Sequence, residues 1–187
     1  MNKLEDVNVA ILAENGFEEV ELTSPRKALE EQGASVSIIS PRAGSIKSWK
    51  GDNWGISLEV DQQVKDASAD DFDALLIPGG VANPDLLRRD ENSVEFTKAF
   101  FKAGKPVASI CHGPQVLIET GALEGRKMTS FNSIKTDLIN AGVNWVDEEV
   151  VVDQGLVTSR NPDDLNAFNR KMVEEFAEGK HAGQQTV

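Results

Sequence analysis

The chain has 187 residues, of which 40% are hydrophobic and 27% charged, with a formal net charge of -12 at pH 7. This composition is typical of a globular protein, and we expect one domain over residues 1–187. The acidic balance argues against a nucleic-acid partner, because phosphate binding depends largely on Lys and Arg. The sequence has neither a signal-peptide core nor an apolar run of the roughly 20 residues that a membrane helix needs. We therefore expect a cytoplasmic protein without a membrane partner.

The sequence contains one cysteine and two histidines. A single cysteine excludes an intrachain disulfide, and so small a set of ligands argues against a dedicated metal site. We predict no metal and no other cofactor. One of the histidines, His181, falls in the polar, patternless segment 179–187, which we expect to be a frayed tail without a role in catalysis.

Compact apolar runs that end at Gly, Pro or Asn predict the buried strands of a sheet. The clearest are Val7–Ala13, Ala34–Ser40, Phe72–Pro78 and Val107–Ile110, followed by shorter candidates at Met128–Phe131, Glu149–Val152 and Leu156–Ser159. Residues 41–60, rich in Gly, Ser and Trp, predict short strands or a hairpin around Gly51-Asp52. Residues 61–71 form an acidic connector.

Helical segments lie between most of these strands. One begins near Glu18 and ends at Gly33, with a disturbance or restart at Pro25 for which Ser24 is a possible cap. The others are 83–103, in which Asn92 is a plausible N-cap, then Ser133–Asn140 and Asp163–Glu178. Strands that alternate with helices in this way predict an α/β fold with a mostly parallel sheet and helices on both faces.

The chain has a candidate nucleophile where the run Val107–Ile110 ends at Cys111-His112-Gly113-Pro114. A strand, a tight turn and a helix in this order hold the turn residue in a strained conformation, and the small residues Ser109 and Gly113 allow close packing. This pattern is a nucleophile elbow with cysteine in place of serine. Pro114 suits the first turn of a helix, whose dipole would favour the thiolate of Cys111.

Ligands of a parallel sheet bind at the carboxyl ends of the strands, so residues 14–18, Gly79-Gly80 and Cys111-His112 are expected to converge. His112 could act as a base toward the thiol, or face solvent. Glu18 could reach Cys111 as a hydrogen-bond donor or an acid and base, or be an acidic residue at a helix start. The N–H groups of Gly80 and His112 could form an oxyanion site, or Gly79-Gly80 could be a simple turn.

The segment Ala108–Gln115 resembles the signature of the PfpI family of intracellular cysteine peptidases, deglycases and glyoxalases, in the class I glutamine amidotransferase-like superfamily. Nearly the whole chain is similar to that family, in segments including 15–22, 72–80, 140–147 and 150–153. The resemblance implies a flavodoxin-like three-layer α/β sandwich and a homodimer or a hexamer built from dimers. It also implies a Cys111 nucleophile beside His112, contacted by Glu18, with Gly80 and His112 as oxyanion donors.

Peptidase-like members of the family carry a Gly-Gly-x-x-Pro-acid pattern, whose acidic residue orients the histidine of the neighbouring subunit. In this chain the pattern reads Gly79-Gly-Val-Ala-Asn-Pro-Asp85, with one extra residue. Asp85 is the matching residue, and the extra residue affects whether Asp85 can contact His112. Without that contact, acyl-enzyme chemistry would be weakened more than thiol addition to an aldehyde.

These features predict a stress-protective cysteine hydrolase or lyase whose substrate is a small carbonyl compound or a peptide, with carbonyl repair favoured over proteolysis. The alternative is a redox sensor or holdase chaperone in which Cys111 is oxidised and not turned over. A glutamine amidotransferase is disfavoured, because no second histidine followed by glutamate occurs near the C-terminal end.

Overall fold

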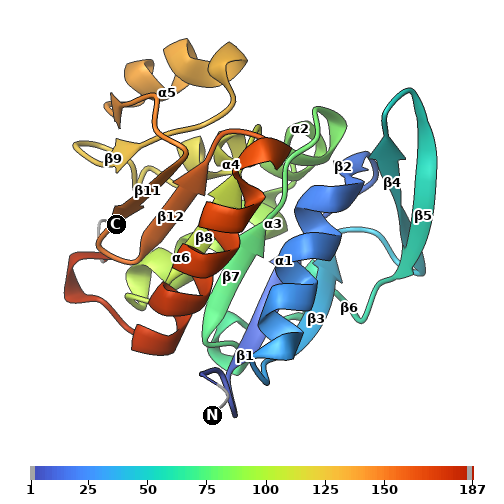
Figure 1. The fold of residues 1–187 in the computed structure, drawn as a ribbon. Coiled ribbons are helices and arrows are strands. Elements are labelled where there is room, and N and C mark those ends of the chain that lie inside the picture. Colours follow the sequence, from blue (N-terminus) through green and yellow to red (C-terminus); the bar gives the residue numbers. More distant parts are fainter. Residues whose placement is uncertain (1–2, 185–186) are drawn as a thin grey trace.

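The computed structural model describes residues 3–184 and 187, and a seven-stranded sheet forms its centre (Figure 1). The strand order is β11-β12-β8-β7-β1-β3-β6, and every neighbouring pair is parallel except β11 and β12. The strands are β1 (Asn8–Leu12), β3 (Ser35–Ser40), β6 (Gln62–Gln63), β7 (Ala74–Ile77), β8 (Val107–Ile110), β11 (Val150–Asp153) and β12 (Leu156–Ser159). The predicted mostly parallel sheet is confirmed.

The sheet lies between two layers of helices, and the side chains of β1 show why. Val9 and Ile11 belong to one buried cluster and Ala10 and Leu12 to another, as expected when successive side chains of a strand point to opposite faces. One face is covered by α1 (Glu19–Glu31) and α6 (Leu165–Glu178), which pack side by side (Figure 1). The other is covered mainly by α2 (Ala82–Arg88), α3 (Glu91–Lys102) and α4 (Pro114–Ile118). This is the predicted flavodoxin-like three-layer sandwich.

Helix α1 is continuous through Pro25, so the predicted restart at that residue was wrong. Proline has no N–H to donate and costs helix stability, but Leu22, Pro25 and Leu29 are all buried. Burial of this face against the sheet therefore offsets the lost hydrogen bond. The side chain of Ser24 accepts a hydrogen bond from Asn169 Nδ2 of α6 at 2.9 Å and does not cap a helix.

Smaller elements differ from the prediction at their ends. The N-cap of α3 is Asp90, which accepts a hydrogen bond from Ser93 N at 2.8 Å, and not Asn92. The strand predicted at 128–131 is only β9 (Lys127–Met128), paired with β10 (Asn144–Trp145). The remaining elements are α5 (Lys135–Asn140) and the short 3-10 helices η1 (Val64–Asp66), η2 (Ala69–Asp71), η3 (Asn132–Ile134), η4 (Pro162–Asp164) and η5 (Ala182–Gln184).

The predicted hairpin around Gly51 is present and forms a small sheet of its own. Strands β4 (Ser45–Lys50) and β5 (Asn53–Glu59) pair antiparallel, and β2 (Phe17–Glu18) adds to β4. The hairpin projects from one end of the molecule (Figure 1). Trp49 and Trp54 lie opposite each other on it, with ring centroids 5.3 Å apart.

The described part of the C-terminal segment is ordered, so the prediction of a frayed tail was wrong for residues 179–184. Gln184 is buried, its Oε1 accepts a hydrogen bond from Arg126 Nη2 at 2.6 Å, and its Nε2 donates to Lys105 O at 3.1 Å. His181 N donates to Gly104 O at 2.8 Å. Residues 185 and 186 of the predicted tail lie outside the described residues. None of the helices in the described part of the chain is both long and apolar enough to span a membrane.

Candidate active site

Cys111 follows β8 directly and has a φ of 63°. A non-glycine residue rarely adopts this left-handed conformation, which costs about 1 to 3 kcal/mol. Two backbone hydrogen bonds hold it: Cys111 N donates to Ser159 O at 3.0 Å, and Phe131 N donates to Cys111 O at 2.9 Å. The nucleophile elbow expected from the sequence is therefore present.

The elbow depends on the small residues that flank it. A Cβ atom on Gly113 would lie 2.4 Å from Ser109 Oγ and 2.8 Å from Ile77 O, closer than real Cβ contacts. Only glycine allows the turn to pack this tightly onto β7 and β8. Pro114 opens α4 as predicted.

The carboxyl group that lies against Cys111 is that of Glu21, in the first turn of α1. Glu21 is fully buried, and a Cβ atom on Gly79 would lie 2.2 Å from Glu21 Oε2 and 2.6 Å from Cys111 Cβ. The polar groups facing this carboxyl are the Cys111 thiol and the amides of Gly79 and Gly80. Among the described residues neither carboxyl oxygen has a hydrogen-bond partner of standard geometry, which suits a group poised to donate.

The sequence prediction assigned this contact to Glu18 and was wrong about which glutamate makes it. Glu18 is the N-cap of α1 and only partly buried, although it lines the same cavity. Glu21 is one helical turn further on, and Pro25 and Leu29 follow it at intervals of four on the buried face. A carboxylate on the apolar face of an amphipathic helix was the signal that could have identified Glu21.

Burial raises the pKa of Glu21 to about 8, with a further contribution from the charge of Glu18. At neutral pH the Glu21 carboxyl is therefore protonated and can donate a hydrogen bond. Burial, together with the charge that Glu21 carries when ionised, also raises the pKa of Cys111, against the opposing effect of the His112 and Gly80 amides at the sulfur. The dipole of the five-residue helix α4, expected from the sequence to favour the thiolate, acts against this desolvation.

His112 is half-buried and contacts the sulfur directly. Its Nδ1 lies 3.2 Å from Cys111 Sγ, its Nε2 lies 2.9 Å from Ser133 Oγ, and its ring stacks on Phe131 at 4.7 Å between centroids. Burial lowers the pKa of His112, so the imidazole is neutral at pH 7. An Nε2–H group that donates to Ser133 leaves Nδ1 free to accept the proton of the thiol. Ser133, which η3 brings to this position, was not predicted from the sequence.

Gly80 lies where the loop after β7 meets the loop after β1. Its φ is 86°, and a Cβ atom there would lie 2.3 Å from Gly16 O and 2.7 Å from Glu18 N, so no other residue fits. The amides of Gly80 and His112 both face Cys111 Sγ. This is the convergence that the oxyanion prediction requires.

Asp85 is an exposed residue of α2. It lines the same cavity as His112 of its own chain. Within the chain, the group in contact with His112 Nε2 is the hydroxyl of Ser133. The assignment of a neighbouring subunit's Asp85 to His112 stays a prediction.

A cavity of about 590 Å³ brings the predicted site residues together. Glu18, Glu21, Gly80, Asp85, Cys111 and His112 all line it. Much of the remaining wall is apolar and comes from Trp49, Trp54, Val81, Ala82, Phe131 and Pro162. The two hairpin tryptophans, for which the sequence left the role open, therefore line the same cavity as Cys111.

Comparison with known proteins shows relatives over almost the whole chain. YraA of Bacillus subtilis, named as a candidate cysteine protease, is 53% identical over 165 residues, covering 88% of this chain and 95% of its own. General stress protein 18 of the same organism is 49% identical, covering 88% and 95%. Deglycase PfpI of Pyrococcus furiosus is 47% identical, covering 89% and 98%.

Solved structures show the same fold. Drosophila melanogaster DJ-1beta superposes with a TM-score of 0.83 at 26% identity, covering 91% of this chain and 90% of that one. A two-domain protein of Anabaena variabilis with a DJ-1/ThiJ/PfpI-like and a ferritin-like domain gives a TM-score of 0.85 at 40% identity, and the match spans 90% of this chain but 48% of that one. The model of the DJ-1/PfpI family matches residues 7–175. On its sequence and its fold, the chain belongs to the DJ-1/PfpI family.

Proposed function

We propose that this protein is a stress-protective cysteine hydrolase or lyase of carbonyl compounds, a deglycase or a glyoxalase-like enzyme. One observation carries the proposal: the strained Cys111 lies between a neutral imidazole and a protonated carboxyl group, and all three line the same cavity. The names of two relatives, a deglycase and a general stress protein, support the same class.

The first step is addition of the thiol to an aldehyde carbon. As the bond between carbon and sulfur forms, the proton of Cys111 passes to His112 Nδ1, 3.2 Å away. Ser133 holds the opposite ring nitrogen and so fixes the orientation of the imidazole. The amides of Gly80 and His112 stabilise the negative charge on the former carbonyl oxygen, which then takes the proton from His112 to give a hemithioacetal.

The second step moves protons within this adduct. For a 2-oxoaldehyde, the Glu21 carboxyl donates its proton to the neighbouring carbonyl oxygen, and the resulting carboxylate takes the proton from the carbon that bears sulfur. Glu21 then returns this proton to the adjacent carbon and takes the proton of the hydroxyl group on the carbon that bears sulfur, which gives a thioester of a 2-hydroxy acid and restores the carboxyl group. Water then releases the acid and restores the Cys111 thiol. The balance is one water added to one oxoaldehyde, and no oxidant is needed.

Peptide cleavage is the competing reaction, since YraA is named as a candidate cysteine protease. An amide is a poorer electrophile than an aldehyde, and burial raises the pKa of the Cys111 thiol. The site therefore favours aldehydes. A redox sensor that uses the same cysteine is the alternative, since Cys111 lines the cavity and its thiolate could also be oxidised.

We also propose that the protein acts in the cytoplasm as a homodimer or a hexamer built from dimers. Asp85 is exposed at the rim of the cavity, where a neighbouring subunit could meet it. In such an assembly Asp85 of one subunit would add a negative charge near His112 of the next.

Product analysis tests the proposed reaction. Wild-type protein should convert methylglyoxal to lactate, detected by NMR, and Cys111→Ser should lower the rate by at least about 100-fold. Lactate formation at the wild-type rate by the serine variant would contradict the mechanism. Hydrolysis of small peptide amides is measured on the same two proteins and should be the slower reaction.

A further inference from the structure

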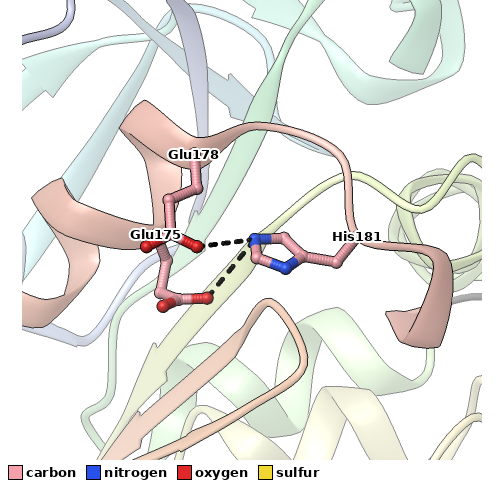
Figure 2. A group of neighbouring side chains, drawn as sticks. All are labelled: Glu175, Glu178 and His181. Atoms are coloured by element: carbon pink, nitrogen blue, oxygen red, sulfur yellow. Dashed lines mark ion pairs between the residues drawn. The ribbon is translucent and has the colours of Figure 1, made fainter.

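A second group of chemically active side chains lies far from Cys111 in the sequence, at the C-terminal end of α6. Glu175 and Glu178 are one helical turn apart, and His181 follows after the chain has turned back (Figure 2). One ligand atom from each of the three residues lies within 4.8 Å of the others. Figure 2 shows both carboxylates on the side of the imidazole that carries Nε2.

The imidazole nitrogen that faces these carboxylates has no hydrogen-bond partner among the described residues, although it is buried. His181 Nε2 lies 3.4 Å from Glu175 Oε2 and 3.8 Å from Glu178 Oε2. Both contacts are ion pairs when the imidazole is protonated, but neither has the geometry of the hydrogen bond that buried polar atoms nearly always form. Two ligands bound to one tetrahedral zinc ion, each about 2.0 to 2.1 Å from the metal, lie about 3.3 Å apart.

The surroundings hold the imidazole in this orientation. His181 N donates to Gly104 O at 2.8 Å, and Gln184 N donates to His181 O at 3.0 Å. The ring lies against the turn between β11 and β12, where a Cβ atom on Gly155 would come within 2.9 Å of His181 Cδ2. These contacts of the fold therefore set the position of the His181 imidazole.

The charges of the group also fit a cation. Glu175 is 8% exposed, and its carboxylate lies beside that of Glu178. A divalent ion between two neighbouring carboxylates balances their negative charges. The side chain of Glu178 is 62% exposed, so the group opens to solvent and leaves room for water as a further ligand.

From this geometry we propose that Glu175, Glu178 and His181 form a binding site for a first-row divalent transition cation, with Zn²⁺ as the best match. Imidazole and carboxylate donors together suit zinc, whereas Mg²⁺ and Ca²⁺ prefer oxygen ligands alone. The ion would tie the C-terminal segment to α6. This site is independent of the reaction proposed at Cys111.

Calorimetric titration of the full chain with Zn²⁺ tests the proposal. Cys111→Ser serves as the background, because Cys111 and His112 could bind zinc themselves. We expect one zinc per chain in this background, binding weakened at least about tenfold by Glu178→Gln and by His181→Asn, and no comparable heat with Mg²⁺. Glu178 is exposed, so its variant tests the site without threatening the fold. In the same proteins, Co²⁺ should give the visible absorption of a tetrahedral complex.

Glu174→Gln is the matched control, since Glu174 is a neighbouring carboxylate of α6 that pairs with Lys171 at 2.6 Å. Its zinc affinity should equal that of the background. The proposal is overturned if the background binds no zinc up to about 1 mM, or if both ligand variants bind as tightly as the background. An equal loss of zinc affinity in Glu174→Gln would overturn the proposal as well, because the loss would then reflect the removal of any negative charge from α6 and not of a zinc ligand.

Discussion

At the scale of single residues, the reactivity of Cys111 depends on where three protons lie. At neutral pH, burial keeps the Glu21 carboxyl protonated and the His112 imidazole neutral. It also keeps the Cys111 thiol protonated until a substrate arrives. Each group is then in the form its proposed role requires. Glu21 can donate, His112 can accept, and Cys111 becomes a nucleophile as its proton departs.

The pH dependence of kcat/KM for an aldehyde substrate follows from these states. His112 must be neutral, so the rate should fall as pH drops through its pKa, which burial places below the ordinary value of 6.5. Glu21 must be protonated, so the rate should also fall as pH rises through about 8. A profile measured from about pH 5 to 10 should be bell-shaped. A rate that keeps increasing above pH 9 would instead indicate that a free thiolate is required.

At the scale of elements, the strand ends were predictable and their side-chain partners were not. Apolar runs that stop at Asn15-Gly16, Gly79-Gly80 and Cys111 indicate strand ends directly, and parallel strands bring such ends to one edge. Choosing between Glu18 and Glu21 requires the rotational phase of α1, which the wrongly predicted break at Pro25 obscured. Ser133 lies 21 residues beyond His112, on a short 3-10 turn that apolar periodicity does not reveal.

The elbow between β8 and α4 should not tolerate a methyl group on Gly113. The alanine Cβ would meet Ser109 Oγ at 2.4 Å and Ile77 O at 2.8 Å, so the turn must open and displace Cys111. We expect Gly113→Ala to lower kcat by about 10- to 100-fold, since small misplacements of a reacting group are costly. Steady-state kinetics on methylglyoxal measures the loss.

A suitable control for this variant is Gly44→Ala. Gly44 has a φ of 80°, but a Cβ atom there meets nothing within 4 Å. It should lower thermal stability slightly through backbone strain and leave kcat unchanged. Full activity in Gly113→Ala would show that the close packing of the elbow is not needed for catalysis.

At the scale of the whole molecule, a buried acid makes the stability of the fold depend on pH. A folded-state pKa of about 8, against an ordinary value of 4.5, means that the folded state keeps a proton which the unfolded state releases. Stability should therefore decline as pH rises from about 4.5 to about 8. At about 1.4 kcal/mol per pKa unit the full cost is at most about 4 to 5 kcal/mol.

Glu21→Gln should remove this cost, because an amide has the same shape and does not ionise. The free energy of unfolding of the variant, measured with urea, should exceed that of the wild type by a few kcal/mol at pH 8 and by little at pH 4.5. A variant less stable than the wild type at pH 8 would mean that the Glu21 carboxyl stabilises the fold. The added stability is expected to come with lost activity, as is common at functional sites.

The global architecture was largely predictable, because nearly every strand of the sheet is an apolar run between helical patterns. The C-terminal segment was not. Residues 179–184 show no apolar period, and what orders them is polar: Gln184 bonds to Arg126 and Lys105, and the backbone of His181 bonds to Gly104. Contacts of this kind depend on distant residues that the fold brings together.

The most direct test of the central claim, that Glu21 is the acid and base partner of Cys111, compares two glutamates that line one cavity. Lactate formation from methylglyoxal is measured for Glu21→Gln and Glu18→Gln beside the wild type. We predict that Glu21→Gln lowers kcat/KM by about 100-fold or more, while Glu18→Gln stays within about fivefold of the wild type. Comparable losses in both variants, or a larger loss in Glu18→Gln, would contradict the assignment.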